Sequence, residues 1–295
     1  MRFAKGHGTG NDFVLVPDPD GEQDLTPELV RALCDRHFGI GADGVLRVVR
    51  TTALDHSQLA GGDQARLPAD AEWFMDYRNA DGSVAEMCGN GIRVFARYLI
   101  EEGLARGPEV AVATRAGLRT VHADGDGQFT VDMGAVELLG EGAVEADGQL
   151  LAGFAISVGN PHLACVVDQP LEAIDLSAPR VLGQAARADG VNVEVVRVVG
   201  AREIAMRVHE RGSGLTLSCG TGAVAAAAAA ALTAGERPAS WLPAPWTVHV
   251  PGGTLAVTLA ARTSLLAGPA EIVARGRVEE SWLTRQRSAA GVGSG

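Results

Sequence analysis

Residues 88–102 read CGNGIRVFARYLIEE, and residues 219–233 read CGTGAVAAAAAAALT. Both stretches begin with Cys-Gly-x-Gly and continue into a segment that predicts a helix. In the first, Ile92, Phe95 and Leu99 recur at helical spacing, and the second is rich in alanine, the strongest helix former. The same cysteine turn thus opens a helix in each half of the chain.

A second signal repeats in the same order. Gly10-Asn11 stands before the apolar run Phe13–Val16, and Gly159-Asn160 stands before the apolar run Leu163–Val167. Two signals that recur in one order and one structural setting indicate an internal duplication. We therefore expect two similar halves that face each other across a cleft, a usual place for a small-molecule site.

Short Val-rich runs bounded by Gly, Pro, Asn or Asp outnumber the helical patterns, and the two kinds do not alternate regularly. This distribution predicts an α+β fold rather than a doubly wound parallel sheet. Besides the two helices that follow the cysteines, Thr26–Asp35 has an N-cap threonine and Pro27 at the first helical position. Pro179–Ala188 is a weaker helix candidate, and Thr51–Ala71 is polar and Gly-rich, as in a surface loop.

Composition excludes several classes of function. The 295 residues carry a net charge of -11, which argues against a nucleic-acid-binding face, because such a face needs a basic patch. The longest apolar run, Ala223–Leu232, is shorter than the roughly 20 residues that span a bilayer, and the first residues do not resemble a signal peptide. We expect a cytoplasmic protein with no nucleic-acid or membrane partner, whose four cysteines are free thiols and bind no metal.

A cysteine directly before a helix meets the free N–H groups and the positive end of the helix dipole. The thiol at Cys88 or Cys219 is therefore expected to ionise more readily than a free cysteine, and a carboxylate is expected to bind beside it. Two such elements facing one substrate would place a base on one side of an α-carbon and an acid on the other. Cys34 and Cys165 lie within a helical pattern and an apolar strand, and we assign both to the core.

Six stretches resemble the diaminopimelate epimerase family and together run through most of the chain: GHGTGNDFVLV, GIGADGVL, RNADGSVAEMCGNGIRVFARYL, SVGNPHLACVV, VNVEVV and ERGSGLTLSCGTGAVAAA. The resemblance implies epimerisation of LL- to meso-diaminopimelate by two cysteines without a cofactor, in lysine and peptidoglycan precursor synthesis. It also implies a homodimer and two pseudo-symmetric domains, each a curved sheet wrapped around a central helix. The implied domains are 1–132 with about 268–285, then 133–267, and a flexible tail at 286–295.

The resemblance further implies the site residues. Cys88 and Cys219 would be the catalytic pair, with His162 beside them in a supporting role near Glu210. The substrate would be held at its reacting carboxylate by Gly89, Asn90, Gly220 and Thr221, at the neighbouring amino group by Asn11 and Glu210, and at its distal end by Asn79, Asn160, Asn192 and Arg211. At the position of Gly44 the family often has a glutamine or a glycine, so the glycine here removes a possible side-chain contact to the substrate. At Leu215 the chain departs from the family, which usually has a glutamate there.

Three alternatives fit the same residues less closely. One is a related racemase that acts on another amino acid such as histidine. Another is a catalytically impaired homologue that only binds an amino acid, which the loss of a carboxylate at Leu215 would favour. The third is a thiol redox protein, if both cysteines faced one cleft and formed a disulfide.

Overall fold

The computed structural model describes residues 1–54, 71–188, 190–241 and 243–291. The chain forms two compact units. Unit 1 contains Met1–Gly8, Asp12–Phe129 and Ala270–Gly295, and unit 2 contains Thr9–Asn11 and Thr130–Pro269. The main divisions fall after Phe129 and before Ala270, and the boundaries at 132 and about 268 given above stay a prediction.

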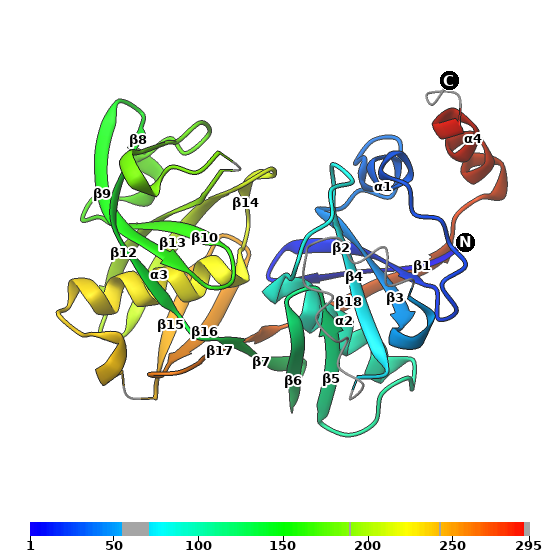
Figure 1. Ribbon diagram of the computed structural model, residues 1–295, viewed down its shortest axis with the longest axis horizontal. Coiled ribbons are helices and arrows are strands. Elements are labelled where there is room, and N and C mark those ends of the chain that lie inside the picture. Colours follow the sequence, from blue (N-terminus) through cyan, green and yellow to red (C-terminus); the bar gives the residue numbers. More distant parts are fainter. Residues whose placement is uncertain (55–70, 189, 242, 292–295) are drawn as a thin grey trace. The chain divides into compact units, whose positions relative to one another are not determined.

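Unit 1 is a mixed sheet around the helix that follows Cys88. Its strands are β1 (Arg2–Gly8), β2 (Asn11–Pro17), β3 (Gly44–Arg50), β4 (Trp73–Asn79), β5 (Glu109–Thr114), β6 (Gly117–Gly125) and β18 (Glu271–Arg277). The central helix is α2 (Gly89–Glu101), whose apolar residues Ile92, Phe95 and Leu99 are fully buried. Helix α2 contacts β1, β3, β4, β5, β6 and β18, as Figure 1 shows. An amphipathic segment thus became a core helix because strands cover it on several sides.

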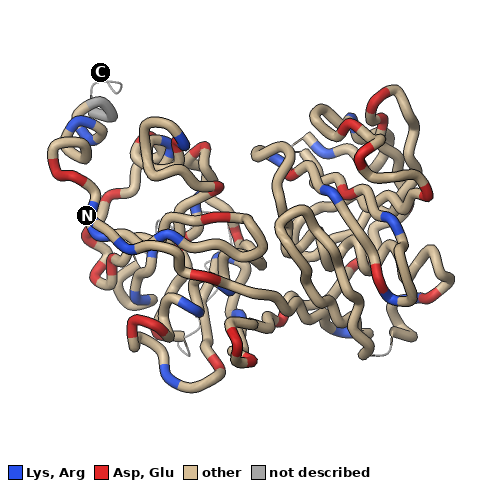
Figure 2. Tube along the Cα trace, turned by 180° about the vertical axis from the view of Figure 1, so that it is seen from behind, with Lys and Arg blue, Asp and Glu red and all other residues tan. Residues whose placement is uncertain are grey.

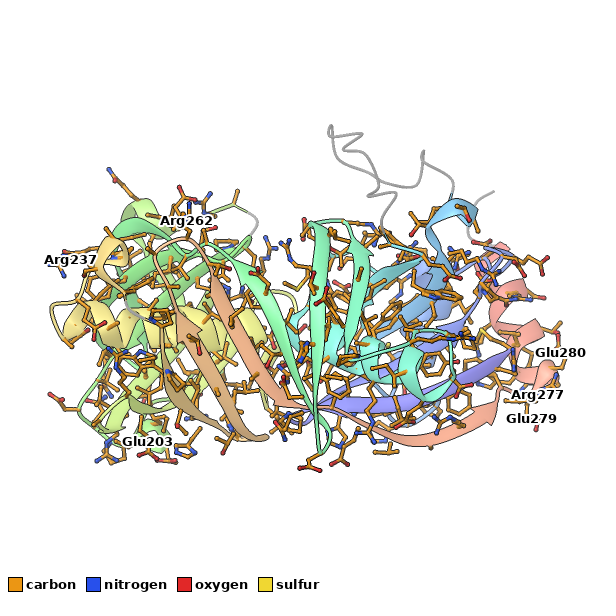
Figure 3. All side chains as sticks on the ribbon, turned by 90° about the horizontal axis from the view of Figure 1, so that it is seen from below. Glu203, Arg237, Arg262, Arg277, Glu279 and Glu280 are labelled. Carbon is orange, nitrogen blue, oxygen red and sulfur yellow. The ribbon has the colours of Figure 1, made fainter. Side chains whose placement is uncertain are left out.

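Unit 2 has the same plan, a mixed sheet around a helix that follows a cysteine, but its central helix is more apolar. Its strands are β8 (Glu137–Ala146), β9 (Gln149–Ser157), β10 (Pro161–Val166), β11 (Arg180–Leu182), β12 (Asn192–Gly200), β13 (Glu203–Glu210), β14 (Gly214–Thr216), β15 (Ala244–Val250), β16 (Gly253–Leu259) and β17 (Ser264–Pro269). The central helix α3 (Gly220–Thr233) is buried on every face up to Leu232, as expected for a helix that is apolar all round. Charged side chains such as Arg237 and Arg262, labelled in Figure 3, project from the outside of the unit.

Strand β7 (Gln128–Gly134) runs across the division at Phe129 and pairs with β17. In each unit the strand after the Gly-Asn element takes part in a parallel pair: β2 with β3, and β10 with β12. Most other pairs are antiparallel, among them β3–β4 and β12–β13. The mixed, strand-dominated pattern confirms the predicted α+β class with two similar halves.

Two smaller helices lie in unit 1. Helix α1 (Pro27–Cys34) begins as predicted, because the Thr26 hydroxyl accepts a hydrogen bond from the N–H of Leu29. Helix α4 (Glu280–Gly291) continues past β18. Residues 286–291 are therefore helical, whereas the sequence analysis assigned them to a flexible tail.

The helix predicted at Pro179–Ala188 is wrong. Residues 180–182 form β11, where Val181 pairs with Val144 of β8, and Gly183–Ala185 form a short 3-10 turn. Gly183 has a φ of 67°, a left-handed conformation that interrupts any helix through this segment. The predicted loop at Thr51–Ala71 lies mostly outside the described residues; Thr51–Ala53 form a 3-10 turn.

Acidic and basic residues are scattered along the chain in both units, as Figure 2 shows. Within the described residues, no helix is long and apolar enough to cross a membrane.

Candidate active site

Cys88 and Cys219 are the N-cap residues of the two central helices. Their backbone dihedrals nearly coincide, with φ and ψ of −136° and 120° at Cys88 and −127° and 121° at Cys219. Each sulfur accepts a hydrogen bond from the N–H three residues later, at 3.3 Å from Gly91 and 3.4 Å from Gly222. The duplicated motif therefore builds the same local structure twice.

The residues between each cysteine and that glycine occupy the first two helical positions: Gly89 and Asn90 in α2, Gly220 and Thr221 in α3. A helix does not use the N–H groups of its first turn internally, and its dipole attracts negative charge there. These four residues thus stand where the sequence analysis expected a carboxylate to bind.

The helix that Cys88 caps carries a buried cation. Arg93 follows Cys88 on the same helix, is fully buried, and donates from Nη2 to Asn90 Oδ1 at 3.0 Å. Burial lowers the pKa of Arg93 to about 10, while the negative charge of Cys88 acts in the opposite direction. The guanidinium is therefore still charged at neutral pH and favours a thiolate at Cys88.

The unit 2 cysteine lies at one end of a buried chain of polar contacts. Cys219 Sγ is 3.5 Å from Thr221 Oγ1, and the Asn160 amide donates to that hydroxyl at 3.3 Å. Asn160 Oδ1 lies 2.9 Å from His162 Nε2, and His162 Nδ1 lies 2.7 Å from Glu194 Oε1. The sequence analysis placed Glu210 near His162, but the carboxylate bonded to the ring is that of Glu194.

Glu210 and Arg211 follow one another at the end of β13. Thr216 donates its hydroxyl to Glu210 Oε1 at 2.5 Å, and Asn192 Oδ1 accepts from the backbone N–H of Arg211 at 2.8 Å. Arg211 also lines a pocket of about 510 Å³ together with Arg180 and Arg187. These contacts bring three of the predicted substrate-binding residues together at one end of β12 and β13.

The remaining predicted residues have simpler settings. Asn11 begins β2 and is buried, and it belongs to unit 2. Asn79 ends β4 in unit 1, pairs with Gly44 of β3, and donates from Nδ2 to Ser83 Oγ at 2.9 Å. Leu215, where the family usually has a glutamate, is about half exposed on β14 and pairs with His209.

The pKa of Cys219 is raised well above its ordinary value. Burial is the largest cause, and the negative charges of Glu210 and Glu194 add to it, outweighing the hydrogen bonds from Thr221 and Gly222. The expectation of easy ionisation is therefore wrong for Cys219, because the helix N-terminus competes with burial and two carboxylates.

Cys34 and Cys165 are buried core residues, as predicted. Burial raises the pKa of each thiol to about 12. All four cysteines are free, and in the described parts of the chain no group of three His, Cys, Asp or Glu side chains is placed to hold a metal ion.

The family model for diaminopimelate epimerase matches residues 3–139 and 154–275. The chain belongs to the diaminopimelate epimerase family. Among curated members, the diaminopimelate epimerase of Thermobifida fusca is 58% identical over 96% of this chain and its own full length. That of Streptomyces coelicolor is 51% identical over 96% of this chain and 97% of its own.

Solved structures that share the fold are far more distant in sequence. A probable proline racemase from Agrobacterium radiobacter has a TM-score of 0.65 at 16% identity and covers 95% of this chain and 93% of its own. A hydroxyproline epimerase from Agrobacterium vitis has a TM-score of 0.63 at 15% identity over 94% and 91% of the two chains. At such identities these likenesses extend to the fold alone.

Sequence reasoning missed two residues of the site, Arg93 and Glu194. Each interrupts an otherwise apolar pattern: Arg93 stands between Ile92 and Val94, and Glu194 stands between Val193 and Val195. A charged residue on the buried side of a helix or inside a Val-rich strand needs a partner, because burying an unpaired charge is costly. A charged residue inside an apolar pattern was therefore the sequence signal that could have identified both residues.

Proposed function

We propose that this chain is a diaminopimelate epimerase that interconverts the LL and meso forms of 2,6-diaminopimelate without a cofactor, in the synthesis of lysine and peptidoglycan precursors. The observation that carries the proposal is the pair of cysteine-capped helices in a chain that aligns with curated family members over almost its whole length.

The chemistry requires a proton to leave one face of a carbon and another to arrive on the opposite face. One cysteine thiolate takes the α-proton and becomes a thiol, while the second thiol gives its proton to the same carbon and becomes a thiolate. The substrate is inverted, and the two cysteines have exchanged roles. Positioned acid–base groups of this kind contribute about 10² to 10⁴ in rate.

The α-proton is weakly acidic, so the negative charge that develops during its removal must be stabilised. We assign this to the first-turn N–H groups of Gly89, Asn90, Gly220 and Thr221, which would hold the reacting carboxylate. Such donors are aligned before the reaction starts and do not need to reorganise.

The surroundings of the two cysteines favour different starting charges. Arg93 places a buried positive charge on the helix that Cys88 caps. Cys219 is buried beside Glu194 and Glu210, which favour the neutral thiol. We therefore propose that, before substrate reacts, Cys88 is the thiolate and Cys219 is the thiol. Cys88 would then remove the α-proton and Cys219 would deliver the new one.

The remaining polar residues suit a substrate that carries an amino-acid group at both ends. We propose that Asn11 and Glu210 hold the amino group at the reacting centre, and that Asn79, Asn160, Asn192 and Arg211 hold the distal end. Arg211 can form a bidentate pair with a carboxylate, and asparagine offers both a donor and an acceptor.

The test is solvent exchange. Purified, reduced protein is incubated with LL-diaminopimelate in D₂O, and deuterium at the α-carbon is followed by NMR together with the appearance of the meso form. We expect both. Parallel incubations use lysine, glutamate, histidine and proline: exchange with histidine alone would indicate the related racemase, and no exchange with any substrate would indicate a binding protein.

The homodimer and the cytoplasmic location stay predictions. Light scattering during gel filtration checks the first, because a dimer has twice the 30.5 kDa mass of one chain.

A further inference from the structure

The two units contain equivalent parallel strand pairs, which allows their residues to be matched. Phe13 stands two residues after Asn11 and pairs with Gly44, and His162 stands two residues after Asn160 and pairs with Asn192. Two positions further along the partner strands are Leu46 in unit 1 and Glu194 in unit 2. Phe13 with Leu46 is therefore the counterpart of His162 with Glu194.

Phe13 and Leu46 in unit 1, and Glu194 in unit 2, lie against the third helical position of their own central helix. A Cβ atom on Gly91 would be 3.3 Å from Leu46 Cδ2 and 3.4 Å from Phe13 Cζ. A Cβ atom on Gly222 would be only 2.7 Å from Glu194 Oε1. One fold thus accepts an apolar pair in one unit and a polar pair in the other.

The polar pair is the more costly choice for stability. Glu194 is 0% exposed and His162 is 1% exposed. Within the described residues, Glu194 Oε2 is buried without a hydrogen-bond partner. A buried carboxylate that is only half satisfied costs free energy that an apolar pair would not, so a role in the reaction explains its presence better than folding does.

We propose that Glu194 is a positioning residue for the reaction of Cys219, an inference that rests on the proposed function. Its carboxylate accepts the Nδ1–H of His162 and so fixes the imidazole ring. The ring Nε2–H in turn donates to Asn160 Oδ1, so that both ring nitrogens are donors to acceptor oxygens. The Asn160 amide donates to the Thr221 hydroxyl, and that hydroxyl contacts Cys219 Sγ.

Each contact restricts the next one. His162 without a fixed ring would leave the Asn160 amide free to rotate, and Thr221 would then lose the donor that orients its hydroxyl. The direction of the Thr221 hydroxyl decides whether it donates to the sulfur or accepts from the thiol. Glu194 thereby controls the Cys219 proton without touching the substrate.

Three variants test this. Glu194→Gln keeps the shape and an acceptor oxygen but removes the charge. The double variant Glu194→Leu with His162→Phe copies the unit 1 pair into unit 2. Asp18→Asn is the matched control, since it removes a carboxylate from a buried ion pair in unit 1, where Asp18 Oδ2 lies 2.6 Å from Arg47 Nη2.

In Glu194→Gln we expect kcat for diaminopimelate to fall about tenfold, which is less than the roughly 10² to 10⁴ that a positioned acid–base group itself contributes, because Glu194 acts only through other residues. We expect KM to change less than threefold and the melting temperature to stay nearly unchanged. The double variant is expected to fold with a melting temperature at or above that of the parent and to lose activity at least as strongly. Asp18→Asn is expected to lower the melting temperature and keep the parental kcat.

A second measurement does not depend on the substrate. The Nδ1–H proton of His162, identified by its loss in His162→Asn, is expected as a slowly exchanging NMR resonance in the parent and in Asp18→Asn, and shifted or broadened in Glu194→Gln. If this holds while the parent does not epimerise diaminopimelate, the proposed function fails and the positioning network stands.

Two results would overturn the proposal. One is a Glu194→Gln protein with parental kcat and an unchanged His162 resonance. The other is a double variant that does not fold, because the polar pair would then serve the structure rather than the reaction.

Discussion

The two cysteine caps share one backbone and differ in the charges behind it. Their dihedrals agree within about ten degrees and their sulfurs accept equivalent N–H bonds. Yet the charge of buried Arg93 acts on Cys88, whereas the charges of Glu194 and Glu210 act on Cys219. Duplication preserved the geometry that places a sulfur at a helix start, and the buried charge around it diverged.

The largest expected effect tests whether both halves are needed. Cys88→Ala and Cys219→Ala should each lower the rate of epimerisation at least about 10³-fold, because each removes one of two proton carriers. Rates are measured by the appearance of meso-diaminopimelate, and circular dichroism checks the fold. Parental activity in either variant would refute the two-base proposal for both.

A smaller effect sharpens the comparison at the third residue after each cysteine. In Gly222→Ala the new Cβ would lie 2.7 Å from Glu194 Oε1, whereas in Gly91→Ala the nearest atoms are 3.3 Å away. We expect Gly222→Ala to lower the free energy of unfolding by about 1–3 kcal/mol. Gly91→Ala should change it by less than about 1 kcal/mol, because better helix propensity offsets the tight contact.

Urea denaturation gives both free energies. Neither glycine has a left-handed φ, so backbone strain does not enter. Equal losses in the two variants would show that the carboxylate of Glu194 moves away without cost.

Removing the buried cation should affect one cysteine only. Arg93→Met leaves Cys88 without a positive charge, so its thiolate fraction should fall and its alkylation by iodoacetamide at pH 7 should slow by about three- to tenfold. Peptide mass spectrometry follows Cys88 and Cys219 separately. Slowing at both cysteines, or at neither, would contradict the assignment of Arg93 to Cys88.

The smallest expected effect is a loss of stability at high pH caused by one buried thiol in each unit, and it should be the same in both units. The pKa of Cys34 in unit 1 and that of Cys165 in unit 2 are each raised to about 12 by burial. Above pH 9 the unfolded thiol loses its proton while the folded thiol keeps it, so the unfolded state binds fewer protons. Stability therefore falls as pH rises from about 9 toward 12, by up to about 1.4 kcal/mol per pH unit for each thiol.

Denaturant melts of the parent, Cys34→Ala and Cys165→Ala at pH 8 and pH 10 measure this. Each variant should lose about 1 kcal/mol less than the parent over that interval. An unchanged pH dependence in either variant would show that its thiol titrates normally in the folded chain.

Much of the fold could be predicted from local signals. Thr26 and Pro27 begin α1, and the two Cys-Gly-x-Gly elements begin α2 and α3, because caps and helix propensity act within a few residues. Pro179–Ala188 failed because its preference is weak and the pairing of β11 with β8 decides the conformation there.

The site divides in the same way. Cys88 and Cys219 could be recognised in the sequence, since a cysteine, two glycines and a following helix specify the sulfur's local setting. The charge environment of each cysteine could not be predicted from the sequence, because Arg93 and Glu194 act through burial and through contacts with Asn90 and His162. The favourable helix dipole was predicted for both cysteines, and the opposing burial of Cys219 was not.

The sequence by itself determined the duplicated plan, the helix starts and the positions of the two cysteines, because hydrophobic periodicity and capping are properties of adjacent residues. Only the tertiary structure decided that Glu194 lies against Gly222, that Arg93 is buried, and that the pKa of Cys219 is raised. Those facts depend on which strands pack on each helix, and desolvation and Coulomb forces act between groups that are distant in the chain.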